Sequence, residues 1–209
     1  MELFVRKFAV VSETPKLEYV EPLFKRRLSQ ISKMTIHALH EVLDCGGDSK
    51  LVFISFRGEI GRQLKINRGL VEDGDVMPAS FSISVFNTPP AVATIALGMK
   101  AGYTAIYPAG GSFSDGLSAA LAPLLSGKEK KIILAYGDEK VPEEYESIES
   151  AGELIFKGPL AFACVISSEV DEKTADGISI RLDNSDFSGP EEFIKYLCSN
   201  SPENTDSGI

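Results

Sequence analysis

The most suggestive chemical feature of the sequence is a glycine-rich junction at residues 110–112. Gly110, Gly111 and Ser112 follow an apolar run at residues 104–109 and precede a stretch with the apolar spacing of a helix. Backbone N–H groups without partners converge at the N-terminus of a helix, so nucleophiles and anions are often bound where a strand runs into one. The sequence therefore predicts that any chemistry of this chain is located at this junction.

A serine hydrolase is one enzyme class that uses such a junction. Its nucleophile turn requires G-x-S-x-G, followed later in the chain by an acid and then a histidine. Ser112 is followed by Phe113 and Ser114, so the closing glycine is missing, and the two histidines, His37 and His40, both precede the serine. The order of residues therefore excludes the α/β-hydrolase mechanism.

The other residues able to bind metals or react form no recognisable site. His37 and His40 fall on the polar side of a predicted helix and are interpreted as surface residues. The cysteines have neither C-x-x-C nor zinc spacing, and Cys164, within an apolar run, is interpreted as a buried and unreactive thiol. The polar turn at residues 183–186 lacks the remainder of a calcium loop, and no phosphate-binding glycine motif is present. We expect neither metal nor cofactor.

Composition excludes several further classes of function. The chain has 209 residues, 44% of them hydrophobic, which is enough for one domain with a substantial core. Its formal net charge of −9 argues against a nucleic-acid surface, and residues 25–27, its one basic cluster, are interpreted as a solvated helix start. No signal peptide or apolar run of membrane-spanning length is evident. These features favour a cytoplasmic protein with reduced thiols.

The spacing of apolar residues predicts helices alternating with strands. Helices are expected at residues 26–43, 60–73, 91–99, 113–124 (kinked or ended early by Pro123) and 191–198, with a short helix or turn at 142–148. Strands are expected at 2–11, 51–56, 104–109, 131–136, 160–167 and 178–182, and a strand or extended loop at 81–86. This order predicts an α/β layered fold with a mixed, mostly parallel sheet. We expect one domain over residues 1–198 and a polar, disordered tail at 199–209.

Three segments, in this order, resemble the β-ketoacyl synthase family. They are RRLSQISKMTIHALHEVL, LVFISFRGEIGRQL and PASFSISVFNTPPAVATIALGMKAGYTAIYPAGGSFSDGLSAALAPLLSG. The resemblance is clearest over residues 20–140 and is nearest to a short, chain-length-factor-like branch of the N-terminal domain. It implies a thiolase-like half-fold.

The resemblance also implies where a nucleophile belongs. Active members carry a cysteine at the N-terminus of a helix, where the helix dipole lowers the pKa of the thiol. Gly110 takes the place of that cysteine and has no side chain to react. The family's two catalytic histidines belong to its C-terminal half, and no histidine follows His40 here. The resemblance thus implies no condensing activity, and an unreactive acyl or anion pocket formed by Ala109, Gly110, Gly111, Ser112 and Asn87.

Two departures from the family bear on this pocket. Pro108 falls in the strand leading to it, where the missing N–H removes a ladder hydrogen bond and implies a bulge. Phe86 replaces a residue that is commonly polar in the Ser-Val-x-Asn segment. Both departures predict a local geometry different from that of an active synthase.

The sequence leaves three functions open. The first is a non-catalytic, chain-length-factor-like subunit that shapes or supports a partner ketosynthase in bacterial fatty-acid or polyketide-type biosynthesis, such as that of aryl polyenes. The second is an acyl-transfer or thioesterase-type enzyme that uses Ser112 or Ser114, assisted by Glu59 or Asp115. The third is an interaction domain unrelated to acyl metabolism.

The expected partners are a ketosynthase, a second copy of the chain, or an acyl carrier protein. Family dimers extend the sheet of this half-fold across their interface. Carrier proteins are acidic, so the net charge of this chain would repel them unless a basic patch reverses it locally. The candidate patch is Lys25, Arg26, Arg27, Arg57, Arg62 and Arg68.

Overall fold

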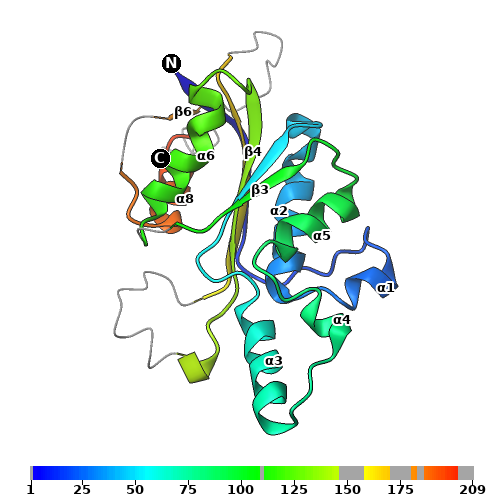
Figure 1. Cartoon of the computed structure of the whole chain (residues 1–209). Helices are drawn as coiled ribbons and strands as arrows, with labels where there is room; N and C mark the ends of the chain where they lie inside the picture. Colours follow the sequence, from blue (N-terminus) through cyan, green and yellow to red (C-terminus); the bar gives the residue numbers. More distant parts are fainter. Residues whose placement is uncertain (1, 109–110, 146–157, 170–179, 183–185, 202–209) are drawn as a thin grey trace, which may run out of the picture.

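A mixed sheet runs through the centre of the molecule and separates two layers of helices (Figure 1). The computed structural model describes residues 2–108, 111–145, 158–169, 180–182 and 186–201. In this part of the chain the sheet has six strands in the order β3-β2-β4-β5-β1-β6. They are β1 (Leu3–Val11), β2 (Lys50–Ile54), β3 (Tyr103–Ile106), β4 (Lys131–Asp138), β5 (Leu160–Ser167) and β6 (Ile180–Leu182).

The two halves of the sheet differ in strand direction. β2 lies parallel to both β3 and β4, whereas β4 with β5, β5 with β1 and β1 with β6 are antiparallel. The sheet is mixed, as predicted, but it is not mostly parallel: in the described part of the chain two ladders are parallel and three are antiparallel. β2, β4 and β5 are covered on both faces, which explains their continuous apolar sequences. The predicted bounds hold for β5, while the strands expected at 51–56 and 104–109 end earlier, at Ile54 and Ile106.

One face of the sheet is covered by α2 (Gln30–Gly46) and α5 (Thr88–Leu97). The predicted start of α2 at residue 26 is wrong, because the side chain of Ser29 caps the helix by accepting a hydrogen bond from the Ser32 N–H (3.1 Å). The helix runs three residues past its predicted end at residue 43 and is capped by Gly47, whose positive φ of 58° favours glycine. The α2 side chains buried against the sheet include Ile31, Met34, Leu39 and Val42.

The opposite face is covered by α6 (Phe113–Leu125) and α8 (Pro190–Ser199). Aromatic rings from both helices and from two strands form the centre of this layer, with ring centroids 5.5–6.2 Å apart: Phe113, Tyr136, Phe162 and Phe193. Aromatic pairs at this separation contribute beyond the area they bury. Pro123 stands in the last turn of α6 and does not end the helix early.

Outside these layers lie α1 (Pro22–Lys25), α3 (Ile60–Glu72) and α4 (Pro78–Phe81). α3 and α4 contain no buried residue and project beyond one end of the sheet (Figure 1). The expectation of a strand or extended loop at residues 81–86 is wrong. α4 ends there in turns, in which the Ser84 N–H donates to the Phe81 carbonyl (3.1 Å) and the Thr88 N–H to the Val85 carbonyl (3.0 Å).

Some predicted segments extend beyond the described residues. Of the predicted helix or turn at 142–148, residues 143–145 are helical and 146–148 lie outside the described part. Residues 178–179 of the last predicted strand also lie outside it. The expected tail lies outside it from residue 202 onward, but its predicted first residue, Ser199, is still part of α8. Among the described helices, none is both long and apolar enough to cross a membrane.

Candidate functional site

The predicted junction follows β3 directly. The described chain passes from Ile106 through Tyr107 and Pro108, resumes at Gly111, and enters α6 at Phe113. Gly111 has a φ of +73°, and its N–H donates to the Pro108 carbonyl (3.0 Å). Ser112 occupies the N-cap of α6 without a capping hydrogen bond from its side chain. Ala109 and Gly110, predicted to belong to the same pocket, lie outside the described residues.

The predicted bulge at Pro108 is wrong, because this proline lies beyond the end of β3 and takes no place in its ladder. Its ring instead packs against α6. A Cβ atom added to Gly116 would lie 2.9 Å from Pro108 Cγ and 3.2 Å from Ile54 Cγ2. The absence of a side chain at Gly116 therefore lets the first turn of α6 approach β2 closely.

Asn87 lies at the same end of the sheet as the junction. The Phe86 ring contacts the Tyr107 ring edge-on (centroids 6.3 Å apart), which brings the Asn87 segment against the residue that follows β3. Phe86 also packs on Gly58, just beyond β2. The Asn87 amide itself donates to the Tyr103 hydroxyl (2.9 Å). The contact between Phe86 and Tyr107 thus brings Asn87 and Ser112 to the same end of the sheet. The Asn87 side chain bonds to Tyr103 and not to Ser112.

A buried carboxylate, Asp138, organises this edge. It accepts hydrogen bonds from the Tyr136 hydroxyl (2.5 Å), the Ser55 hydroxyl (2.7 Å) and the backbone N–H groups of Arg57 (2.9 Å) and Phe56 (3.3 Å). Burial raises the pKa of Asp138, and the hydroxyl donors Tyr136 and Ser55 oppose that rise. Because donors surround a carboxylate that is fully buried, Asp138 fixes the turn after β2 and has no access to a substrate proton.

Two glutamates continue the polar cluster around the first turn of α3. Glu59 is fully buried and accepts from the hydroxyls of Ser29 (2.7 Å) and Ser32 (2.8 Å) while it pairs with Arg62 Nε (3.1 Å). It therefore links α3 to the start of α2 and does not face the junction serines as an assisting base. Glu139 accepts from the Gly61 N–H (2.7 Å), and burial raises the pKa of Glu139 to about 7.

Ser114 is engaged with the backbone of Phe187. Its hydroxyl donates to the Phe187 carbonyl (3.0 Å) and accepts from the Phe187 N–H (2.9 Å). This arrangement fastens α6 to the segment before α8. Both hydrogen bonds of the Ser114 hydroxyl are thus made to the backbone, which gives this serine a structural role.

The histidines lie on the other side of the sheet from the junction, on α2. As predicted, their side chains are substantially exposed, 35% for His37 and 44% for His40. The Tyr19 ring stacks on His40 (centroids 3.9 Å apart), and its hydroxyl lies 3.2 Å from His37 Nδ1. Neither histidine can act as a base toward Ser112, because the sheet separates them.

Cys164 and the side chains able to bind metals form no reactive site in the described part of the chain. Cys164 is fully buried in β5, and burial raises the pKa of its thiol, as expected for an unreactive cysteine. Among the described residues, no group of three or more His, Cys, Asp or Glu side chains is arranged to hold a metal ion.

Sequence reasoning missed the Asp138 cluster. Asp138 and Ser55 are 83 positions apart, and only the parallel pairing of β2 with β4 brings them together. The available signal was positional: a polar residue ends each of two adjacent apolar strands, and such strand ends meet at one edge of a parallel sheet.

Comparison with known proteins identifies the family. Residues 5–192 match the family described as the N-terminal domain of β-ketoacyl synthase. No curated protein matches the chain.

Solved structures share the fold at low sequence identity. A ketosynthase (ApeO) in complex with its chain length factor (ApeC) from Xenorhabdus doucetiae matches with a TM-score of 0.69 and 18% identity, over 81% of this chain and 80% of that chain. The ishigamide ketosynthase/chain length factor matches with a TM-score of 0.62 and 10% identity, over 86% and 64% of the two chains. A β-ketoacyl synthase from Burkholderia phymatum matches with a TM-score of 0.53 and 13% identity, over 74% of this chain and 45% of that chain.

These likenesses establish the thiolase-like fold predicted from the sequence, with the mixed sheet between two helical layers. The match spans less than half of the Burkholderia synthase but four fifths of the chain from the Xenorhabdus complex. Because the family match extends over most of its sequence, this chain belongs to the β-ketoacyl synthase family through its N-terminal domain.

Proposed function

We propose that this chain is a non-catalytic subunit that pairs with a catalytic ketosynthase, in the manner of a chain length factor. The observation that carries the proposal is the glycine at the family's nucleophile position, Gly110, in a chain whose fold matches that of a ketosynthase–chain length factor complex. Such a subunit shapes or supports the acyl site of its partner and performs no condensation itself.

The matched structures support pairing with a second chain. One of them is a ketosynthase in complex with its chain length factor, and the match covers 81% of this chain and 80% of that chain. The fold of this chain therefore has a precedent within a ketosynthase–chain length factor complex.

The free edge of β3 supports a particular mode of pairing. β3 ends the sheet in the described part of the chain. The Gly102 and Ile106 carbonyls accept from the Leu51 and Ser55 N–H groups (3.1 and 3.2 Å), so these carbonyls face β2. Backbone groups alternate in direction along a strand, and the Ala105 N–H therefore points away from β2. An incoming strand can use that donor to extend the sheet.

Exposed apolar side chains flank the same edge. Ile95 on α5 is 69% exposed and Tyr107, just beyond β3, is 60% exposed. Large apolar groups that remain in water are typical of surfaces that become covered by a partner. We propose that the ketosynthase covers them when its own edge strand pairs with β3.

The proposed pathway is inferred from the activity of the proposed partner. A ketosynthase elongates acyl chains, so the proposed role is in bacterial fatty-acid or polyketide-type biosynthesis, including pathways of the aryl polyene type. The acyl-transfer or thioesterase alternative gains no support from the geometry, because Ser114 is bonded to the Phe187 backbone and the histidines lie across the sheet from Ser112.

Co-expression with the ketosynthases of the same genome tests the proposal. One ketosynthase should co-purify with this chain in equal amounts, and condensation by the complex should require the cysteine of the ketosynthase only. Ala105→Pro removes the outward N–H while leaving the bonds from Leu51 and Ser55 intact, and should abolish co-purification. Ala105→Ser retains the N–H and is the matched control.

Two results would overturn the proposal. One is a covalent acyl adduct on this chain that disappears in Ser112→Ala, because it would establish an acyl-transferring enzyme. The other is failure of every ketosynthase of that genome to associate with a folded chain, as judged by circular dichroism. Equal association of the Ala105→Pro and Ala105→Ser variants would overturn the β3 interface while leaving the pairing itself in place.

A further inference from the structure

The two histidines of α2 form a cluster with Tyr19, which belongs to the segment between β1 and α1. The Tyr19 ring stacks on the His40 ring, with centroids 3.9 Å apart and an angle of 17° between the ring planes. The Tyr19 hydroxyl lies 3.2 Å from His37 Nδ1. Glu41 Oε1 lies 3.3 Å from His40 Nδ1 and 4.0 Å from His37 Nδ1. One tyrosine from the segment thus contacts two imidazoles of the helix, and a carboxylate lies beside both.

Tyr19 stands between two buried side chains of the same segment, Leu17 and Val20. Leu17 adopts a φ of +50°, and its carbonyl accepts from the Val20 N–H (3.2 Å) and from Lys25 Nζ (3.3 Å). A left-handed conformation at leucine is unfavourable and persists only where surrounding contacts enforce it. The strained backbone lowers the free energy needed to open the segment, and the Tyr19 contacts oppose that opening.

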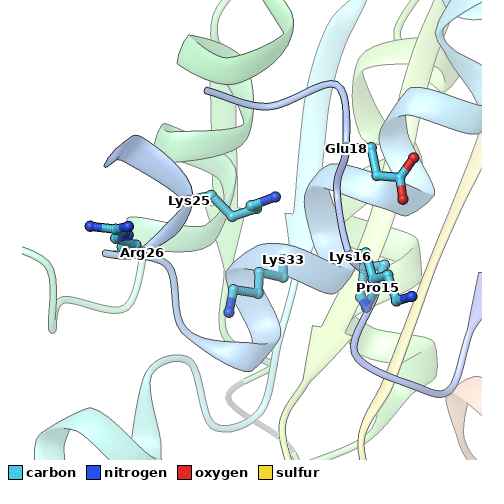
Figure 2. Close-up of a pocket in the computed structure, with 6 residues that line it drawn as sticks. All are labelled: Pro15, Lys16, Glu18, Lys25, Arg26 and Lys33. Carbon is cyan, nitrogen blue, oxygen red and sulfur yellow. The ribbon is translucent and has the colours of Figure 1, made fainter. Parts of the chain in front are cut away.

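The segment also borders an open hollow of about 430 Å³ beside α1 (Figure 2). Of the basic patch expected from the sequence, Lys25 and Arg26 line this hollow, whereas Arg62 and Arg68 pair with carboxylates elsewhere. The hollow is lined by residues of the segment, of the end of α1 and of the start of α2: Pro15, Lys16, Glu18, Lys25, Arg26 and Lys33. Opening of the segment therefore changes the shape of the hollow.

Protonation of the histidines strengthens the contacts of the cluster. Imidazole side chains gain a proton between about pH 8 and pH 5. A charged His40 places a cation against the face of the Tyr19 ring and beside the Glu41 carboxylate, and both attractions are absent from the neutral ring. His37 Nδ1 can bond the Tyr19 hydroxyl in either charge state, because a hydroxyl both donates and accepts. Burial and the charge of Glu41 raise the pKa of Tyr19 to about 12, so the hydroxyl keeps its proton over this whole range.

The other charged groups of α2 and of the segment at residues 12–21 do not oppose this gain of charge. Two charged imidazoles one turn apart repel each other, and Glu41 offsets that repulsion because it lies beside both. Asp44 pairs with Lys7 (2.9 Å), and Glu21 accepts from the N–H groups of α1, so both acids are engaged elsewhere. Four of the six remaining charged side chains on these two elements are acidic: Glu13, Glu18, Glu21, Asp44, Lys16 and Lys33.

From this geometry we infer that Tyr19, His37, His40 and Glu41 form a proton-dependent clasp between the segment at residues 12–21 and α2. The clasp holds the segment more firmly at mildly acidic pH, when the histidines are charged, than near pH 8. Charged imidazoles strengthen the closed form and not the open form, so by linkage the added fastening is present at low pH and is lost as pH rises. The inference does not depend on the proposed function.

Amide hydrogen exchange of the full chain at pH 5.5 and pH 7.5 tests the clasp. The Val20 N–H, which donates to the Leu17 carbonyl, reports opening of the segment. After correction for the intrinsic exchange rate, its protection factor should be about fivefold higher at pH 5.5, as expected for one exposed cation–π contact and one surface ion pair. The comparison is repeated in Glu139→Gln, because burial raises the pKa of Glu139 to about 7 and its titration alters the stability of the whole chain.

Variants of the cluster separate its contributions. His37→Gln/His40→Gln removes both imidazoles of the chain and should give equal Val20 protection at the two pH values. His40→Arg carries a permanent charge that can stack on Tyr19 and should keep the higher protection at both. Tyr19→Phe retains the ring face and the pH dependence, whereas Tyr19→Leu should lose the pH dependence.

The remaining outcomes overturn the inference. Equal protection of Val20 at pH 5.5 and pH 7.5 in the unmodified chain would show that the histidines do not fasten the segment. A pH dependence that persists in His37→Gln/His40→Gln would assign the effect to other groups. A parallel change in the amides of β5 would show that the whole chain opens and not the segment alone. Circular dichroism checks that each variant is folded, and the histidine side chains are 35% and 44% exposed, so their replacement leaves the core intact.

Discussion

Glu139 Oε1 accepts a hydrogen bond from the Gly61 N–H at 2.7 Å, which joins the end of β4 to the first turn of α3. Gly61 leaves room for this contact, because a Cβ atom at that position would lie 3.2 Å from the same oxygen. Glu139 is 7% exposed, and the charges of Glu59 and Asp138 act on its carboxyl group. Its titration is therefore coupled to folding.

Stability should fall as pH rises through the titration of Glu139. Burial raises its folded-state pKa to about 7 from a usual value of 4.5, so the folded chain binds more protons than the unfolded chain between these values. The contribution is fully present below pH 4.5 and is lost by about pH 7. Urea unfolding at pH 5 and pH 8 should show Glu139→Gln losing about 2–3 kcal/mol less than the unmodified chain. Parallel pH profiles for the two proteins would contradict this.

Removing the Tyr136 hydroxyl should destabilise the fold without affecting its shape. Tyr136→Phe deletes one of the donors to buried Asp138, which should lower the free energy of unfolding by about 2 kcal/mol. Tyr107→Phe, at an exposed ring, is the control and should change stability by less than about 0.5 kcal/mol. Equal stability of the two variants would indicate that Asp138 does not depend on this donor.

The two junction serines should differ in their effect on stability. Ser114→Ala removes both bonds to the Phe187 backbone and should cost about 1–2 kcal/mol in thermal or urea unfolding. Ser112→Ala removes no capping bond and should be neutral within about 0.5 kcal/mol. The reverse order would mean that Ser112 has a structural contact stronger than that of Ser114.

Adding a methyl group at two helical glycines should change the stability of the chain in opposite directions. Gly116→Ala forces the new Cβ against the rigid Pro108 ring and Ile54, and should destabilise the chain by about 1–3 kcal/mol. Gly69→Ala, in α3, meets only the Asp75 carbonyl at 3.5 Å and should stabilise it by about 0.5–1 kcal/mol through helix propensity. A gain of stability in both variants would show that α6 moves freely away from β2.

The sequence predicts those parts of the fold that depend on local pattern. The predictions of a strand at 160–167 and of a helix at 191–198 are confirmed, because they depend only on neighbouring residues: an apolar run in the first case and Gly189-Pro190 at the helix start in the second. The strand or extended loop predicted at residues 81–86 is wrong, because Phe, Ile and Val alternate there with Ser in the pattern of a strand. Pro78 instead starts a helix, and the Gln63 side chain donates to the Ser84 carbonyl (3.1 Å). The Asp138 contacts depend on the order of strands in the sheet, and Leu17 adopts a left-handed φ of +50°; no local pattern reveals either.

The position of β1 between β5 and β6 sets the order in which the chain can fold. Its partners follow about 150 residues later, as in the pairing of Phe8 with Cys164. At synthesis rates of about 5–20 residues per second, β1 is made on the order of 8–30 s before these partners. During that time an apolar strand stands unpaired, and a distant contact must close before the sheet is complete. Closure of the β5-β1-β6 half of the sheet is therefore expected to be a late and slow step of folding.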